Sequence, residues 1–336
     1  MSVLSVITSE KYTFFLSYTQ FLPKFTTKNF DMIQFAKKYL LGIVFLCALQ
    51  FASFAQSISI SELKQKAKHG DVKAQSALGA YFYNGEYGLK QNYKTAYKYF
   101  AQAAAQGDAQ AQNDLGVCLK DGRGVKPDLV AAVQMFEKAA AQGLAVAQFN
   151  LAVCYANGQG LSKSPTEALE WYKKAAEQGN TKAMFNIAVA YATGQGVTRN
   201  NAEALNWYKK AAELGDADAQ FNLGYCYYVG QGVKKNYAEA VNYYKQAAMQ
   251  NDADAQDALG TCYLQGYGVV KSFSEAAKWF QIAAEQGHDN AQFYIGWCYD
   301  KGYGVPRNYK EAKKWYTKAA EQGNRKAKSS LRNLKK

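Results

Sequence analysis

Hydrophobic and polar residues alternate with helical spacing along most of this chain. In residues 216–251, small or apolar side chains recur three and four positions apart at Ala219, Leu223 and Cys226, which predicts a helix that buries this stripe. A second stripe with the same spacing runs over residues 240–248. The segment is therefore expected to form two amphipathic helices joined by a turn.

This helix-pair pattern recurs seven times, with a period of 36 residues. The predicted repeats are residues 71–107, 108–143, 144–179, 180–215, 216–251, 252–287 and 288–323, and the first has one extra residue in its turn. Capping helices are expected at residues 56–70 and 324–336. Because one helix pair cannot bury its own apolar face, the sequence predicts an all-α fold, an α/α solenoid of stacked repeats.

One position of the second helix is aromatic in every repeat and is expected to fill the space between helices. The residues at this position are Phe100, Phe136, Tyr172, Tyr208, Tyr244, Phe280 and Tyr316. A register shared by all copies predicts a buried ladder, in which each ring contributes about 1.5 to 3 kcal/mol by the area that it buries.

The Gly-x-Gly turn at Gly230 and Gly232 suggests a phosphate loop, but its context differs. Such loops follow a strand and carry a third glycine in register, whereas here no strand is expected and the pair recurs in every repeat. We interpret Gly230 as the left-handed end of the first helix and Gly232 as part of the turn. Asn251 replaces the glycine that ends the other second helices and is predicted to be left-handed too.

The repeated letters carry a family resemblance. The pattern A-x-x-x-L-G-x-x-Y-x-x-G-x-G-V, followed by E-A-x-x-W-Y-x-K-A-A-E-x-G, resembles the Sel1-like repeat, a relative of the tetratricopeptide repeat, over residues 61–336. The resemblance implies a superhelix whose concave side binds peptides or proteins, and a role as an adaptor or regulator. It does not identify the partner, and no cofactor is expected.

Residues 32–55 have the layout of a secretory signal peptide. Lys37 and Lys38 precede a long apolar run, and the small residues Ser53 and Ala55 stand at the two positions that signal peptidase reads. A membrane-spanning helix needs about 20 apolar residues, and this run is shorter. We therefore expect cleavage of the segment, no stable membrane span afterwards, and a protein that is periplasmic or extracellular.

Residues 1–31 precede a plausible start at Met32 and are interpreted as an upstream extension. Residues 1–55 hold five of the 40 Lys and Arg and two of the 27 Asp and Glu, so the exported chain keeps a net charge of about +10. This charge favours an acidic partner. An anionic surface is the other ligand that it favours, and an evenly charged, solvated surface is an equal alternative. Export argues against nucleic acid, and a monomer is expected.

Five cysteines share one repeat position: Cys118, Cys154, Cys226, Cys262 and Cys298. Two other copies carry Tyr81 and Ala190 there, so the position is read as core packing. Neighbouring helices should lie about 8 to 10 Å apart. A disulfide needs Cα atoms within about 7 Å, so free thiols are expected.

The sequence offers little catalytic or metal chemistry. His69 and His288 lie at repeat boundaries without spaced ligands, so no metal site is predicted. The segment Ser61–Lys64 matches the S-x-x-K motif of β-lactamases, which matters because cysteine-rich relatives of this repeat have been linked to β-lactam hydrolysis. However, no S-D-N element exists, and Ser61 also fits a helix N-cap. We expect no enzyme activity, and a β-lactamase-type hydrolase stays a remote alternative.

Partner binding is expected on the face of the first helices opposite the buried stripe, because its residues differ between repeats. We predict a groove lined by Asn150, Val153, Asn186, Val189, Asn222, Tyr225, Tyr228, Tyr294 and Trp297. Rigid aromatic residues that not every copy shares are typical interface anchors, and the asparagines could hold a peptide backbone. The groove should lie in the C-terminal half and take an extended peptide or protein segment.

Two other readings of this face stay open. Exposed Tyr and Trp also stack on sugar rings, so a cell-wall glycan is the competing ligand. Alternatively, the repeats form a rigid spacer without a specific groove.

Overall fold

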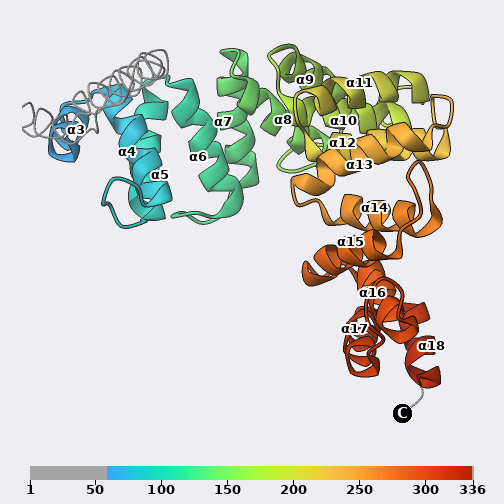
Figure 1. The fold of residues 1–336 in the computed structure, drawn as a ribbon. Helices are drawn as coiled ribbons and strands as arrows, with labels where there is room; N and C mark the ends of the chain where they lie inside the picture. The colour runs from blue at the N-terminus through green and yellow to red at the C-terminus, as the bar shows by residue number, and fades with distance from the viewer. Residues whose placement is uncertain (1–58, 335–336) are drawn as a thin grey trace, which may run out of the picture. The chain divides into compact units, whose positions relative to one another are not determined.

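The computed structural model describes residues 59–334. The predicted signal peptide at 32–55 and the extension at 1–31 lie outside these residues. The chain divides into two compact units, residues 1–63 and 64–336, and all the repeats belong to the second. Every described element is an α-helix, as the sequence predicts (Figure 1).

Each repeat consists of two helices of 13 residues. The first helices are α4 (Val72–Asn84), α6 (Ala109–Asp121), α8 (Ala145–Asn157), α10 (Thr181–Thr193), α12 (Ala217–Val229), α14 (Ala253–Gln265) and α16 (Asp289–Lys301). The second helices are α5 (Tyr93–Ala105), α7 (Leu129–Ala141), α9 (Pro165–Glu177), α11 (Asn201–Glu213), α13 (Tyr237–Met249), α15 (Phe273–Glu285) and α17 (Tyr309–Glu321). Two shorter helices, α3 (Ile60–Lys68) and α18 (Arg325–Asn333), flank them.

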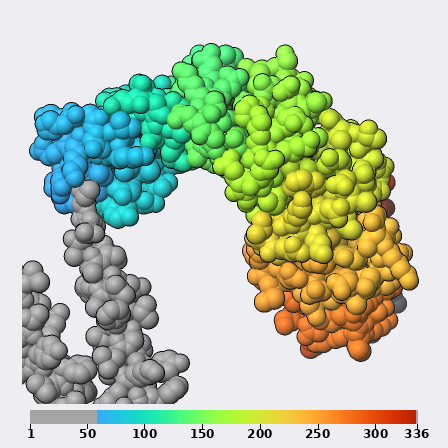
Figure 2. All heavy atoms as spheres, turned by 90° about the horizontal axis from the view of Figure 1, so that it is seen from above, coloured from blue at the N-terminus to red at the C-terminus, as the bar shows by residue number. Residues whose placement is uncertain are grey.

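The helices pack in chain order. Each first helix packs against the second helix of its own repeat, and each second helix packs against the first helix of the next. Figure 2 shows the successive repeats of the second unit lying side by side. Contacts between the first helices of neighbouring repeats are far fewer, so part of their surface is left uncovered.

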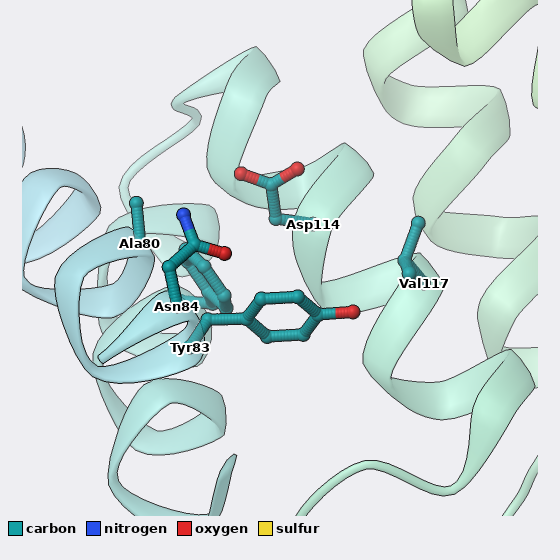
Figure 3. Close-up of a pocket in the computed structure, with 6 residues that line it drawn as sticks. Ala80, Tyr83, Asn84, Asp114 and Val117 are labelled. Atoms are coloured by element: carbon teal, nitrogen blue, oxygen red, sulfur yellow. The ribbon is translucent and has the colours of Figure 1, made fainter. Parts of the chain in front are cut away.

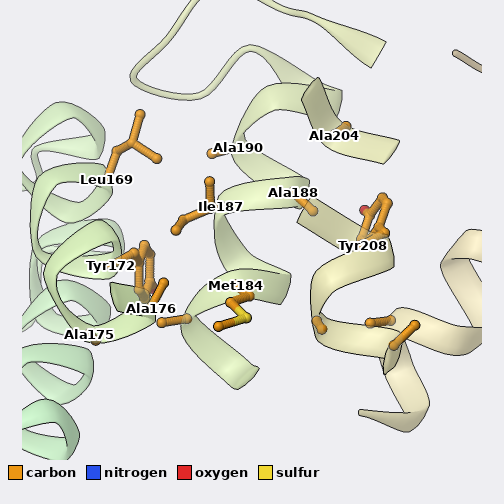
Figure 4. Close-up of a cluster of buried hydrophobic side chains, with 14 of the residues drawn as sticks. Leu169, Tyr172, Ala175, Ala176, Met184, Ile187, Ala188, Ala190, Ala204 and Tyr208 are labelled. Atoms are coloured by element: carbon orange, nitrogen blue, oxygen red, sulfur yellow. The ribbon is translucent and has the colours of Figure 1, made fainter. Parts of the chain in front are cut away.

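The aromatic ladder is confirmed as the core. Figure 4 shows one segment of it, where Ile187 of α10 lies between Tyr172 of α9 and Tyr208 of α11. A glycine of the first helix opposes the ring in five repeats, and a Cβ at Gly224 would lie 2.7 Å from Cδ1 of Tyr244. Small residues thus let the ring approach the first helix closely.

Two repeats show what a larger residue does at this contact. Ala152 and Ala188 stand where the other repeats have glycine. The facing Tyr172 and Tyr208 are 6% and 5% exposed, whereas the other five rings of the ladder are at most 2% exposed. One methyl group therefore coincides with slightly less complete burial of the ring.

The predicted left-handed positions are confirmed. Gly230 ends α12 with φ +83°, and its backbone N–H donates to the carbonyl of Cys226. Asn251 has φ +69° at the end of α13. Gly232 does more than turn the chain, because a Cβ there would lie 2.4 Å from the carbonyl oxygen of Asn201, at the start of α11 in the preceding repeat.

Pairs of glutamines, one buried and one exposed in each pair, connect neighbouring repeats and were not predicted from the sequence. In α14, Gln256 is 2% exposed and its Nε2 donates to the carbonyl of Ala248 in the preceding repeat at 3.1 Å. Its Oε1 accepts from Nε2 of Gln286 at 2.7 Å. We call this arrangement the glutamine bridge. It recurs in six repeats, through Gln75–Gln106, Gln112–Gln142, Gln148–Gln178, Gln220–Gln250, Gln256–Gln286 and Gln292–Gln322.

The five aligned cysteines are buried with free thiols, as expected for packing residues. Burial raises the pKa of Cys226 to about 11 and that of Cys262 to about 12. Only the thiolate form of cysteine acts as a nucleophile or a metal ligand. Because these thiols stay protonated, they are expected to be unreactive in the folded protein.

Candidate partner-binding face

One surface along the first helices carries different residues from repeat to repeat. We define the first-helix face by the positions of Asn222, Tyr225, Tyr228 and Val229 in α12, and by the equivalent positions of the other first helices. Equivalent residues are Ala77, Ala80, Tyr83 and Asn84 in α4, Asp114, Val117, Lys120 and Asp121 in α6, and Tyr294, Trp297, Asp300 and Lys301 in α16.

Tyr225 is the most open aromatic residue among the predicted site residues. Its side chain is 48% exposed in the middle of α12, and Val229 one turn later is 38% exposed. Neither is needed to fill the core, because Leu223 and Cys226 occupy the buried stripe of the same helix. An aromatic side chain that is not used for packing is available to a partner.

The predicted asparagines are half-buried, and their amides already hold neighbouring groups. Nδ2 of Asn222 donates to the carbonyl of Asp218 at 2.8 Å, and Nδ2 of Asn186 donates in the same way to Lys182 at 2.7 Å. In α8, Nδ2 of Asn150 donates to Oδ1 of Asn113 at 2.8 Å. The side-chain oxygens of Asn186 and Asn222 are therefore the groups best placed to accept from a partner N–H.

Val153 and Val189 are half-buried as well. Both pack against the hydrophobic cluster that α9 and α10 share. They can form a floor for a bound segment but present little surface of their own.

Tyr228 belongs to an aromatic cluster rather than standing alone. Its ring centroid lies 5.3 Å from that of Tyr237 and 6.0 Å from that of Tyr267, and the latter two rings stack at 4.8 Å. Burial raises the pKa of the Tyr228 phenol. The cluster joins the fifth repeat to the turn of the sixth, so Tyr228 contributes to the scaffold as well as to the face.

Tyr294 and Trp297 differ in their surroundings. Tyr294 stacks on the buried Phe280 at 4.9 Å, whereas Trp297 lies 4.8 Å from Tyr303 and lines a cavity of about 510 Å³ between α16 and α18. Arg307 and Asp300 line the same cavity. Trp297 is therefore placed at an open site at the C-terminal end of the repeats.

A second cavity lies on the first-helix face at the other end of the repeats, where no site residue was predicted. It measures about 220 Å³ and is lined by Ala80, Tyr83 and Asn84 of α4, Phe100 of α5, and Asp114 and Val117 of α6 (Figure 3). We call it the α4–α6 pocket. The signal in the sequence was Asp114, since its equivalents in the other repeats are uncharged Ala, Asn or Tyr.

Asp114 is the only charged residue that lines the α4–α6 pocket. Its Oδ1 accepts from Nε2 of Gln110 at 2.9 Å and from Nδ2 of Asn113 at 3.0 Å. Burial nevertheless raises the pKa of its carboxyl group, because desolvation outweighs these two hydrogen bonds. At the rim, Nη1 of Arg123 donates to Oη of Tyr83 at 2.6 Å.

Another polar cluster lies between α14 and α16. Asp257 replaces the phenylalanine found at this position in four other repeats, and Nδ2 of Asn290 donates to its Oδ2 at 2.7 Å. His288 caps α16 by accepting from the N–H of Ala291, while its Nε2 lies 3.0 Å from Oδ1 of Asp254. These bonds join two repeats and hold the start of α16.

Within residues 59–334, no three or more His, Cys, Asp or Glu side chains are grouped so as to hold a metal ion. No helix in that same part of the chain has the length and apolarity to cross a membrane.

Comparisons with known proteins agree with this architecture. A family model described as Sel1 repeat matches residues 72–108, 109–144, 145–180, 181–216, 217–252, 253–288 and 289–324, each one residue later in register than the predicted repeats. No curated protein matches this chain.

Two solved structures are similar over most of the chain. One is c5321, a protective antigen of uropathogenic Escherichia coli strains with an SLR fold, at 38% identity and a TM-score of 0.71. The match covers 81% of this chain but only 58% of the antigen. The other is a Sel1 repeat protein from Oxalobacter formigenes, at 35% identity and a TM-score of 0.69, covering 82% of this chain and 80% of that one. The chain therefore belongs to the Sel1 repeat family.

Proposed function

We propose that this Sel1 repeat scaffold is an exported, non-catalytic adaptor that binds an extended segment of a protein partner on its first-helix face. The observation that carries the proposal is Tyr225, an aromatic side chain left 48% exposed at a position that the core does not need. Rigid aromatic residues of this kind supply much of the binding energy in protein interfaces. Trp297 at its cavity would provide a second anchor.

Selection of peptides tests this proposal directly. A random 12-residue peptide library displayed on phage would be selected on the immobilised protein, and selected peptides would be measured against Tyr225→Ala and Trp297→Ala. Each variant is expected to weaken binding by about fivefold or more, since such anchors contribute 1 kcal/mol or more. Helicity should stay unchanged because neither side chain fills the core.

Met249→Ala is the matched control, because Met249 is 83% exposed but lies on a second helix. Equal binding by all three variants and the wild type would contradict the proposal. Co-sedimentation with purified peptidoglycan, in the absence of any selected peptide, would favour the glycan reading instead.

Export is part of the proposal and rests on the layout of residues 32–55. Expression of the full chain in a bacterium, followed by N-terminal sequencing of the product, is expected to show a mature chain that begins at Gln56. A product that keeps residues 32–55 and stays with the cells would exclude cleavage.

A further inference from the structure

The α4–α6 pocket contains a negative charge that the protein itself does not neutralise. Within the described chain, no basic side chain forms an ion pair with Asp114, and the two bases nearest in sequence, Lys120 and Arg123, pair with Asp121 instead. A half-buried carboxylate without a counter-charge is costly, which leaves a site that a cation would stabilise.

A network of hydrogen bonds holds this carboxylate in place. Asn150 of the third repeat donates to Asn113, and Asn113 and Gln110 both donate to Oδ1 of Asp114. Both of these donors use Oδ1, and no donor within residues 59–334 contacts Oδ2. The network therefore fixes the side chain and leaves one oxygen for a ligand.

The walls of the pocket fit the rest of a lysine side chain. Tyr83, Phe100 and Val117 provide apolar surface for a methylene stem. Nδ2 of Asn84 donates to Glu86 at 3.0 Å, and Figure 3 shows the Asn84 side chain among the residues that line the pocket. An ammonium group has three donors, one of which Oδ2 of Asp114 can accept.

Arginine fits this arrangement less well. The guanidinium group recognises a carboxylate through two parallel hydrogen bonds, one to each oxygen. Oδ1 of Asp114 is already occupied by two donors, so only one of these bonds is open. A compact ammonium group needs a single free oxygen.

We propose that the α4–α6 pocket binds the side chain of a lysine in the partner segment, with its ammonium group on Oδ2 of Asp114. This inference rests on the proposed function, since the segment that carries the lysine is the one bound along the first-helix face. The net charge of the protein favours a partner that is acidic overall, and the pocket requires that the bound segment of this partner contain one lysine.

Library selection on wild type and on Asp114→Asn tests the proposal. The variant keeps the shape of the side chain, and Asn150, Asn186 and Asn222 occupy the same repeat position, so the scaffold accepts it. Peptides selected on wild type are expected to share a lysine at one position, and selection on Asp114→Asn should lose this preference. Asp218→Asn, which removes an exposed carboxylate from α12, should keep it.

A double-mutant cycle then assigns the lysine to Asp114. Replacing the shared lysine of a selected peptide by methionine removes the charge and keeps the stem. Kd is expected to rise about tenfold on wild type and less than about twofold on Asp114→Asn. A peptide with arginine in place of lysine should bind several-fold more weakly than the lysine peptide.

The possible outcomes separate this inference from the proposed function. Three results, obtained with peptides that depend on Tyr225, would overturn the inference alone. The peptides share no lysine, or replacing the lysine by methionine raises Kd equally on wild type and on Asp114→Asn, or the arginine peptide binds as well as the lysine peptide. Failure to select any peptide would count against both.

Discussion

Nε2 of Gln286 donates to Oε1 of Gln256 at 2.7 Å, and this pair ties the sixth repeat to the fifth because Gln256 also donates to the carbonyl of Ala248. One repeat lacks such a pair: Met184 and Leu214 stand at the equivalent positions of the fourth repeat. Both glutamines are replaced together there by apolar residues, as expected if the two positions are energetically coupled.

This coupling predicts the effect of breaking and then replacing a bridge. Gln256→Met alone removes the hydrogen bonds to Gln286 and to the carbonyl of Ala248 and is expected to lower the free energy of unfolding by about 1 to 3 kcal/mol. Adding Gln286→Leu should recover most of that loss, since apolar replacement of both partners can be nearly neutral. Urea denaturation followed by circular dichroism measures both effects.

The fourth repeat supplies the reciprocal control. Met184→Gln alone is expected to destabilise because the oxygen of the introduced amide is buried without a donor while Leu214 stands opposite. The combination with Leu214→Gln should destabilise less. Additive effects in either pair would show that the two positions are independent.

The aromatic ladder predicts a large difference between two identical substitutions. Tyr244 is 2% exposed, so Tyr244→Ala should open a cavity and lower the free energy of unfolding by about 3 to 5 kcal/mol. Tyr225→Ala, on the exposed side of α12, should change it by less than about 0.5 kcal/mol. Similar melting temperatures for the two variants would refute this assignment of core and face.

Asn251 is held in a left-handed conformation, with φ +69°. Asn251→Gly is expected to be neutral or slightly stabilising, whereas Asn251→Ala should cost about 1 kcal/mol, because alanine tolerates this region poorly. Thermal melts of the two variants would decide. A glycine variant clearly less stable than wild type would mean that the hydrogen bond from Asn251 to Gln286 matters more than its backbone.

The buried thiols should be unreactive until the protein unfolds. Burial raises the pKa of Cys226 to about 11 and that of Cys298 to about 12, so at pH 8 almost no thiolate forms. A full-length Cys47→Ser variant should show slow reaction with a disulfide reagent when native, and five reactive thiols in denaturant. Three or fewer thiols in denaturant would reveal a disulfide.

Asp114 predicts a pH-dependent stability effect. Burial raises the pKa of its carboxyl group above the value in the unfolded chain, so the folded state binds the proton more tightly. The protein therefore loses stability as pH rises from the unfolded pKa, about 4, to the higher pKa of the folded state. Asp114→Asn should therefore melt higher than wild type at pH 7, with the difference shrinking toward about pH 4, near the unfolded value. A variant that melts lower at pH 7 would show that the ionised carboxylate stabilises the fold.

Much of the fold could be predicted because each buried position can be compared across seven repeats of the same chain. The position of Tyr244 is aromatic in all of them, and only a shared packing role explains that. The glutamine bridge escaped because a glutamine beside the buried stripe resembles a solvated residue. Its one sign in the sequence was that the fourth repeat lacks both glutamines and carries Met184 and Leu214 in their place.

The candidate site was less predictable because exposure on the first-helix face depends on neighbouring repeats. Tyr225 and Tyr228 look equivalent in the sequence. However, Tyr267, from the turn of the next repeat, packs against Tyr228 and not against Tyr225. The α4–α6 pocket forms where two first helices leave a gap, which no periodicity within one repeat describes. Asp114 was therefore passed over although its charge is unusual at that position.

Besides the packing of apolar side chains, each junction between repeats has contacts that end on main-chain atoms. Gly232 lies against the backbone of Asn201, and the glutamine bridge ends on a carbonyl oxygen, so neither contact depends on which side chains the preceding repeat carries on its surface. A unit of 36 residues can then be duplicated, deleted or exchanged as a cassette without redesign of its joints. Gene rearrangement could thus alter the order of face residues, and hence partner choice, while the framework stays the same.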